Sequence, residues 1–356
     1  MKKLNLILLP IALTASSLSA NDIHKNIDFS SQKQSIINQN INVSELNLND
    51  LNTNSYQKLF ELHEKNAENN DPDIQYKLAV LYENSDEYDK NYHKAIELYL
   101  KSADNGNHMA QNKLGMIYHD GLGVEQNYHE SIKWFSKAAN QGNSESQYQL
   151  GRIYLDGNII GQNFKKGLDL IQKSANQDFP PAQYILGTMY YEADRIEKNI
   201  KKALNWYQKA ANNGSSDAQY KLGHIYIKGV ELKKDIDKGL KLLMQSASQK
   251  HPHAQYHLAT MYYQGTILDK NYHKAFDLFT QSANQGVAKA QLGLAIMYLE
   301  GNGCDKNYQK AFYWAEKSAN QGLTTAQNIL TVMYKHGIGV GKNNDKSKDD
   351  TSEIIR

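Results

Sequence analysis

The chain has 356 residues, and its 40 basic and 38 acidic side chains leave a formal net charge of only +2. This near balance does not favour a nucleic-acid partner, which usually needs a strong basic excess. The one cysteine, Cys304, excludes a framework of internal disulfides.

Residues 1–20 have the pattern of a secretory signal peptide. Lys2 and Lys3 precede a short apolar stretch, and small residues follow it. Cleavage after Ser19 fits the small-residue rule better than cleavage after Ala20, and both sites stay open. The apolar stretch is too short to cross a bilayer. We therefore expect an exported protein, periplasmic or secreted, without stable membrane insertion after cleavage; an uncleaved anchor is the alternative.

Three further segments differ from the rest of the chain in composition. Residues 21–53 are rich in Asn, Gln and Ser, which predicts a disordered leader. Residues 54–69 carry Tyr56 and Leu59 at helical spacing and predict an N-terminal capping helix, which a stacked array requires at its end. Residues 342–356 are charged and polar and predict a disordered tail.

Residues 70–341 repeat with a period of 36. One glutamine, called the marker glutamine below, recurs in eight copies without insertion, and a leucine and a tyrosine follow each copy. The copies are Gln75, Gln111, Gln147, Gln183, Gln219, Gln255, Gln291 and Gln327. A fixed period of this length indicates stacked supersecondary modules. We expect seven full repeats and a C-terminal half repeat.

Each repeat is predicted to contain two helices, A and B. Helix A begins near a proline such as Pro180, which a first helical turn tolerates. One residue earlier stands a predicted N-cap, as at Asn107. The spacing of Leu150, Ile153 and Tyr154 is helical, and a glycine follows helix A in most copies.

Small residues recur inside both helices. Helix A carries glycine or alanine one residue after its leucine, as at Gly115, and helix B carries a recurrent alanine, as at Ala139. Glycine inside a helix costs about 1 kcal/mol relative to alanine, so we expect that close helix packing requires it. Where Asp178 and Lys250 replace the glycine after helix B, and where Glu192 and Ala193 replace turn residues, we expect distorted loops.

The pattern in Ala182–Tyr190, Gly121–Val124 and Lys202–Gly214 resembles the Sel-one-like repeat, a relative of the tetratricopeptide repeat. The resemblance covers about residues 70–340. It implies an all-α, right-handed superhelical solenoid of antiparallel helix pairs. It also implies a non-enzymatic scaffold that binds other proteins, with roles in assembling complexes, in envelope maintenance or in contact with host cells.

A row of polar and aromatic side chains on helix A is the predicted binding face. In the tetratricopeptide family, the corresponding positions line a concave groove, so the resemblance implies that a partner protein or peptide binds there. The alternative is that the tyrosines pack between successive A helices, and a tyrosine can do both. The predicted residues are Tyr148, Arg152, Tyr184, Thr188, Tyr220, His224, Tyr256 and Thr260.

Neither a metal nor a cofactor is expected. His251, His253 and His257 have a spacing that could bind zinc, but no acidic or cysteine ligand completes the set, and surface histidines are the simpler interpretation. Cys304 occupies a slot that holds Val, Ile or Leu in other copies, which favours a packing role over a reactive thiol.

Enzymatic activity is the second hypothesis. Ser-x-x-Lys, the nucleophile motif of serine β-lactamases, occurs at Ser30–Lys33 and Ser55–Lys58, in the predicted leader and cap. The family resemblance includes cysteine-rich members described as weak β-lactamases, but their paired cysteines are missing here. We therefore expect no catalytic residues. A purely structural envelope protein without a specific ligand is the third hypothesis.

Overall fold

The computed structural model describes residues 70–83, 88–193 and 195–340. The predicted signal peptide, leader, cap and tail lie outside these residues. The regular elements of the described residues are all α helices, which alternate between A and B in chain order. The A helices are α4 (Pro72–Glu83), α6 (His108–Asp120), α8 (Ser144–Asp156), α10 (Pro180–Glu192), α12 (Ser216–Lys228), α14 (Pro252–Gln264), α16 (Ala288–Glu300) and α18 (Thr324–His336). The B helices are α5 (Tyr88–Asp104), α7 (Tyr128–Asn140), α9 (Phe164–Asn176), α11 (Ile200–Asn212), α13 (Ile236–Ser248), α15 (Tyr272–Asn284) and α17 (Tyr308–Asn320).

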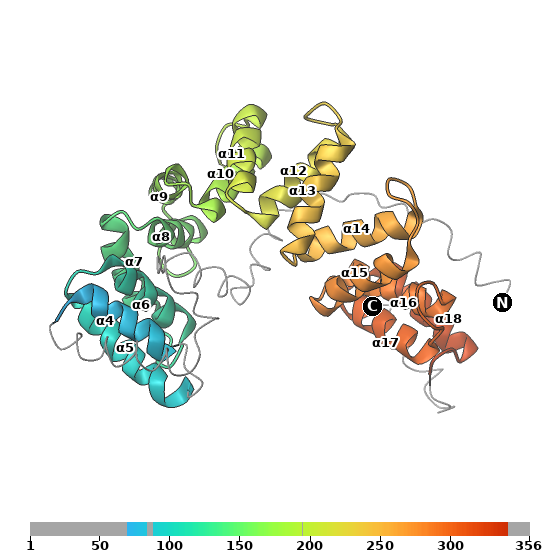
Figure 1. Cartoon of the computed structure of the whole chain (residues 1–356), viewed down its shortest axis with the longest axis horizontal. Helices are drawn as coiled ribbons and strands as arrows, with labels where there is room; N and C mark the ends of the chain where they lie inside the picture. Colours follow the sequence, from blue (N-terminus) through green and yellow to red (C-terminus); the bar gives the residue numbers. More distant parts are fainter. Residues whose placement is uncertain (1–69, 84–87, 194, 341–356) are drawn as a thin grey trace. The chain divides into compact units, whose positions relative to one another are not determined.

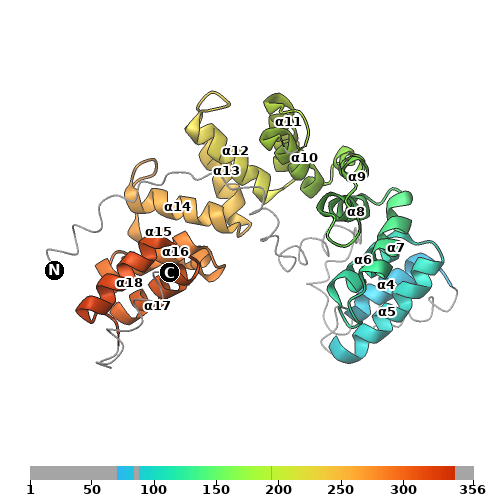
Figure 2. The same ribbon diagram turned by 180° about the vertical axis from the view of Figure 1, so that it is seen from behind.

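Each helix packs on its neighbours in the sequence. Every A helix that is followed by a B helix contacts it, and each B helix contacts the A helix of the next repeat. Figures 1 and 2 show this order from opposite sides. The predicted all-α solenoid of helix pairs is thereby confirmed. None of the helices in the described part of the chain combines the length and the apolar character that crossing a bilayer requires.

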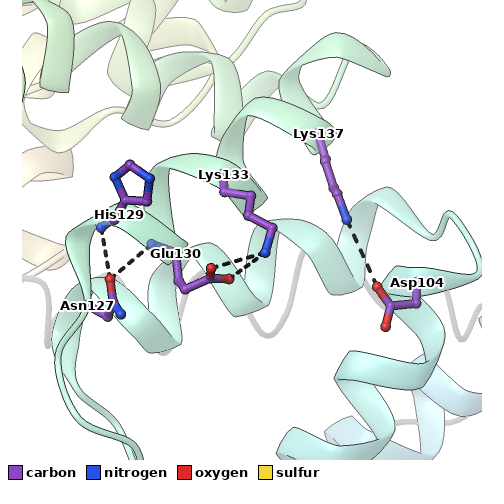
Figure 3. A network of polar contacts seen from close by, with 6 residues as sticks. All are labelled: Asp104, Asn127, His129, Glu130, Lys133 and Lys137. Carbon is purple, nitrogen blue, oxygen red and sulfur yellow. Dashed lines mark hydrogen bonds and ion pairs between the residues drawn. The ribbon is translucent and has the colours of Figure 1, made fainter.

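The helix ends follow local chemistry. The Asn107 side chain accepts a hydrogen bond from the backbone N–H of Ala110, so the predicted cap of α6 is confirmed. The B helices α7, α9, α11, α13, α15 and α17 are capped in the same way by Asn or Asp. At α7, the side chain of Asn127 accepts from the backbone N–H groups of His129 and Glu130, both at 3.1 Å (Figure 3).

The prediction of distorted loops is wrong at Asp178 and Lys250. Both residues adopt the left-handed conformation, with φ of +60° and +64°, that Gly142 has at +89°. Their backbone N–H groups donate to the carbonyls of Ala175 (3.2 Å) and Ala247 (2.9 Å). The N–H of Gly142 donates in the same way to the carbonyl of Ala139 (3.0 Å). Hydrogen bonding and helix packing therefore hold the turn geometry against a local cost of about 1–2 kcal/mol for a side chain there.

Glycine inside helix A is required by packing, as predicted. A Cβ atom on Gly115 would lie 2.4 Å from Cδ1 of Phe135, a fully buried ring of the B helix in the same repeat. At Gly187 it would lie 2.8 Å from Cδ1 of Tyr207, which is also buried. The cost of glycine is thus offset by the large aromatic side chain that the missing Cβ admits.

The marker glutamine joins three helices. The side-chain amide of Gln111 donates to the carbonyl of Ala103 in the preceding B helix at 3.0 Å, and its oxygen accepts from Gln141 after the following B helix at 2.8 Å. The same pair of bonds recurs at Gln147, Gln183, Gln219, Gln255 and Gln291. A buried amide with both ends satisfied explains why this position is always glutamine.

Candidate interaction face on the A helices

The eight predicted site residues all lie on the A helices α8, α10, α12 and α14, and they divide by exposure. Tyr148 and Tyr256 are only 3 % and 6 % exposed, and Thr188 and Thr260 are 8 % and 9 % exposed. The Tyr148 ring packs against Phe179, with centroids 5.3 Å apart. These four side chains therefore belong to the packing between helices. The four half-buried residues, which a ligand could reach, are Arg152, Tyr184, Tyr220 and His224.

Polar side chains connect successive A helices directly. The Asn112 amide of α6 donates to the Glu145 carboxylate of α8 at 2.8 Å, and the Ser146 hydroxyl donates to Asn112 at 2.6 Å. Further along, the Tyr191 hydroxyl of α10 donates to Glu231 after α12, and Tyr263 of α14 donates to Glu300 of α16 at 2.5 Å. The polar side chains that link the A helices in this way, from Asn112 of α6 to Glu300 of α16, form one face of the array. It is called the A-helix face below.

The N-terminal part of the A-helix face contains carboxylates. Glu83 accepts from the Tyr99 hydroxyl at 2.6 Å and pairs with Lys113 at 3.0 Å. Glu145 is only 6 % exposed, and its burial raises the pKa of its carboxyl, although Asn112 and Lys113 oppose the shift. These acids are held in place by Lys113 and Asn112 of α6 and, for Glu83, also by Tyr99 of the B helix α5.

Farther along the face, aromatic and imidazole rings gather around Tyr220. The histidine cluster consists of Tyr220 and His224 from α12 and of His251, His253 and His257 at the start of α14. Tyr220 stacks on His251 with centroids 4.8 Å apart and lies 5.6 Å from His257. His224 meets His257 edge to face at 5.4 Å. Two adjacent A helices therefore contribute to one set of rings.

Within the histidine cluster, His251 has a structural task. Its Nδ1 accepts from the backbone N–H of Ala254 at 3.1 Å and so caps α14, while its Nε2 lies 3.3 Å from the Asp217 carboxylate. Both ring nitrogens thus have partners, and imidazole serves at this helix start where Asn or Ser serves at others.

The environment keeps the remaining imidazoles neutral. Burial lowers the pKa of His224 to about 4, and the nearby positive charges of Lys228 and Lys221 act in the same direction. Burial lowers the pKa of His257 to about 3, helped by His224 and His253. The pKa of His253 is also lowered, chiefly by burial. At neutral pH these rings are therefore uncharged hydrogen-bonding groups.

Sequence reasoning separated residues that the structure brings together. It placed His224 in the binding row and the other three histidines in a loop and a first turn. The signal that could have joined them is the period itself, because it places α12 and α14 in successive repeats, and the A helices of successive repeats contribute to one face. Among the described residues, no three His, Cys, Asp or Glu side chains are arranged to hold a metal ion.

Cys304 is half-buried in the loop after α16, with its Sγ 3.7 Å from the carbonyl oxygen of Met297. Burial raises the pKa of its thiol, which keeps the sulfur protonated and poorly nucleophilic at neutral pH. The position agrees with the predicted packing role in the loop.

Comparison with known proteins supports the repeat assignment. The model of the Sel1 repeat matches residues 72–107, 108–143, 144–179, 180–215, 216–251, 252–287, 288–323 and 325–349. A Sel1 repeat protein from Oxalobacter formigenes is 26% identical, covers 94% of this chain and all of its own length, and superposes with a TM-score of 0.62. The protein c5321, described as a protective antigen of uropathogenic Escherichia coli strains with an SLR fold, is 27% identical over 82% of this chain and 70% of its own, with a TM-score of 0.50.

A comparison with curated proteins finds no match. The repeat model nevertheless extends over most of the chain, and its boundaries fall between helix pairs, one pair for each full repeat. The chain belongs to the Sel1 repeat family.

Proposed function

We propose that this protein is an exported, non-enzymatic scaffold that binds a partner protein or peptide on its A-helix face. Sel1 repeat proteins generally act as protein–protein interaction scaffolds, and solenoids of this family are typically non-catalytic. The observation that carries the proposal is the half-buried set Arg152, Tyr184, Tyr220 and His224. Tyr184 and Tyr220 directly follow the marker glutamine of their repeats, and Arg152 and His224 share the slot four residues further on. The chemistry of that second slot varies between repeats, while the surrounding packing positions keep theirs.

The proposed location rests on the sequence of the first 20 residues. Their basic start, short apolar stretch and small residues are those of a cleaved export signal. The similar protein c5321 is described as a protective antigen, which supports a role in contact with a host. Cell fractionation and N-terminal sequencing test the location. A mature chain that begins at Ala20 or Asn21 in the periplasm or medium is expected, and a full-length chain in the cytoplasm would contradict export.

Photo-crosslinking tests the binding face. A photoreactive amino acid replaces Arg152 or Lys228 on A helices, and Lys173 or Lys209 on B helices serves as the matched control. The exported protein is irradiated in its own cells and in contact with host cells. We expect one recurrent protein adduct from the A positions and not from the B positions.

Equal capture from both sets of positions would show that the A-helix face is not the binding site. An absence of adducts from every position would favour the third hypothesis, a structural envelope protein without a specific ligand. Helix content measured by circular dichroism verifies that each substituted protein is folded.

A further inference from the structure

Repeats five to seven carry a concentration of basic and proton-accepting side chains on the A-helix face. We call this set the basic face. It consists of Lys221, His224 and Lys228 of α12, His253 and His257 of α14, and Lys289 of α16. The edge-to-face contact of His224 with His257, at 5.4 Å, joins the first two helices, and α14 contacts α16. The basic face is therefore one surface across three adjacent repeats.

Two lysines of the basic face have no charged partner among the described residues. Lys228 and Lys289 are exposed, and neither forms an ion pair or a ring contact with any residue that the structure describes. Both lie close enough to His257 to lower the pKa of its imidazole. Lys221 is half-buried, with its Nζ 4.6 Å from the centre of the Tyr191 ring. Lys228 and Lys289 thus stand near the imidazoles without a charged partner in the described part of the chain.

Three acids lie near the basic face, namely Asp217, Glu192 and Glu231, and the last two act on Lys221. Asp217 lies 3.3 Å from Nε2 of His251, and Glu231 accepts the hydroxyl proton of Tyr191. The titratable and charged groups around His224 and His257 are Asp217, Tyr220, Lys221, Lys228, Glu231, His251, His253, Tyr256 and Lys289. Glu192 and Glu231 oppose the charge of Lys221. Lys228 and Lys289 remain as exposed cations without a carboxylate partner within the residues that the structure describes, and an anion would complement them.

We propose that the basic face binds a carboxylate-rich extended segment of a partner protein, held by Lys228 and Lys289 at its margins and by the imidazoles between them. An extended segment fits because the cationic groups follow one another along three helices instead of converging on one point. This inference rests on the proposed function, since it names the chemistry of the partner on the A-helix face.

Proton uptake should accompany binding. A carboxylate placed against His224 and His257 favours their charged form and reverses the effect of Lys228 and Lys289 on the imidazole pKa values. The complex then holds more protons than the free protein. Affinity should therefore rise as the pH falls, by up to about tenfold per pH unit for each proton taken up.

The test uses the full mature chain and a fluorescein-labelled peptide of alternating Glu and Ser. The control peptide has Gln at every Glu position. Fluorescence anisotropy at pH about 7.5 and about 6, on either side of the ordinary histidine pKa, measures both affinities. We expect the Glu peptide to bind at least about tenfold more tightly than the Gln peptide, with the difference growing at the lower pH.

Two variants separate the roles of the side chains. Lys228→Gln with Lys289→Gln should weaken binding of the Glu peptide about tenfold and keep its pH dependence. His224→Gln with His257→Gln should reduce the pH dependence, and His224→Gln alone serves if the half-buried His257 does not tolerate replacement. Lys173→Gln with Lys209→Gln, on the B helices, is the matched control and should change neither quantity.

Similar binding of the two peptides, or no loss in the lysine variant, would overturn the proposal. So would tighter binding of an oligonucleotide of equal charge, which would mean the wrong class of ligand. Failure here is distinguishable from failure of the proposed function. Crosslinking of a partner without an acidic segment from Arg152 or Lys228 would leave the scaffold role standing and remove this inference alone.

Discussion

The marker glutamine shows how one side chain can govern an interface between repeats. Gln219 donates to the carbonyl of Ala211 at 3.2 Å and accepts from the amide of Gln249 at 2.8 Å. It is only 6 % exposed. In a buried site a lost hydrogen bond leaves a polar partner without water, which costs more than the bond itself contributes. Glutamine is the residue that reaches both partners with one amide.

Gln219→Leu should therefore destabilise the protein although it adds an apolar side chain of similar size. The expected loss is about 1–3 kcal/mol, because the Ala211 carbonyl and the Gln249 amide lose their partner. Urea denaturation followed by circular dichroism measures it. Gln172→Leu, at an exposed position of α9, is the control and should change stability by less than about 0.5 kcal/mol. Equal effects of the two substitutions would refute the role assigned to Gln219.

The histidine cluster predicts that acid weakens the fold. In the unfolded chain His224 and His257 protonate near pH 6.5, whereas in the folded chain their pKa values are about 4 and about 3. The unfolded state thus binds more protons below pH 6.5, and stability falls from there towards pH 4. After allowance for solvent screening, the loss at pH about 5 is about 2 kcal/mol.

Melting temperatures measured between pH 7 and 5 test this sign. The double variant His224→Gln with His257→Gln should show a flatter pH dependence than the parent. The variant His129→Gln with His273→Gln, at exposed positions, should follow the parent. If both double variants keep the full dependence on pH, other groups control the acid response.

For single residues, the sequence predicts which side chains are equivalent in successive repeats better than it predicts what each one contacts. The period identifies Gln219 and Tyr148 as equivalent to their counterparts in other repeats, but it does not say that one bridges three helices and the other is buried against Phe179. Those facts depend on which side chains meet across a repeat boundary. The period does show which A helices are neighbours. A comparison of the A helices of successive repeats would therefore have placed His224 and His257 close together.

Among the elements, the helix pair is held by the same contact in most repeats. A lysine in the first turn of helix B lies over the ring of the helix A tyrosine that stands seven residues after the marker glutamine. The distance from Lys166 to the Tyr154 ring is 4.3 Å, and that from Lys238 to Tyr226 is 4.4 Å. At an exposed site such a pair contributes about 0.5–1 kcal/mol. This contact accounts for the tyrosine seven residues after the marker glutamine in the six repeats that have a lysine in this slot.

The second repeat departs from this pattern. Glu130 stands in the lysine slot of α7 and pairs with Lys133 at 3.0 Å instead (Figure 3). In the same helix, Lys137 reaches Asp104 at the end of α5, at 4.0 Å. One ion pair thus lies within α7 and the other joins two repeats. The helix pair therefore forms without the lysine–tyrosine contact, with other surface contacts in its place.

The ends of the B helices offer a way to raise stability. Lys250 has a φ of +64° where most other repeats have glycine, and a side chain in this conformation costs about 1–2 kcal/mol. Lys250→Gly should therefore raise the melting temperature. Lys241→Gly, within α13, should lower it, because glycine in a helix interior is destabilising. A lower melting temperature for Lys250→Gly, measured by circular dichroism, would show that the side chain has a stabilising role.

Helix boundaries were largely predictable because caps act locally. Asn107 and Gly121 mark the two ends of α6 through bonds to residues three or four positions away. The conformation of Asp178 was not predictable by the same reasoning, because its geometry is set by the packing of α9 and α10 on either side. Local propensity and tertiary packing disagree there, and packing determines the outcome.

For the whole molecule, contacts between neighbours predict tolerance to removal of complete repeats. Deletion of residues 180–215 brings Gln219 to the position of Gln183, where the Ala175 carbonyl can replace that of Ala211. We expect this variant to keep its helix content per residue and to melt cooperatively. Deletion of residues 180–197 removes only α10 and leaves α11 without its partner, so helix content should fall.

Circular dichroism melting of the two deletions distinguishes the cases. The same loss of helix in both would contradict an array whose units touch only their neighbours. Both variants keep the same chain ends, so a difference between them must come from the register of the remaining helices.

The glutamine bridges also bear on how such a protein evolves. The boundaries at Gln111, Gln147, Gln183, Gln219, Gln255 and Gln291 use a backbone carbonyl and a side-chain amide at the same relative positions, so these modules can follow one another without new adaptation. Recombination between two misaligned copies of the gene can shift the sequence by a whole number of repeats. The new contacts between repeats would then be ones that already occur elsewhere in the molecule. Relatives of this protein should accordingly differ in length by whole modules, while insertions of other sizes should be found between helices or at the chain ends.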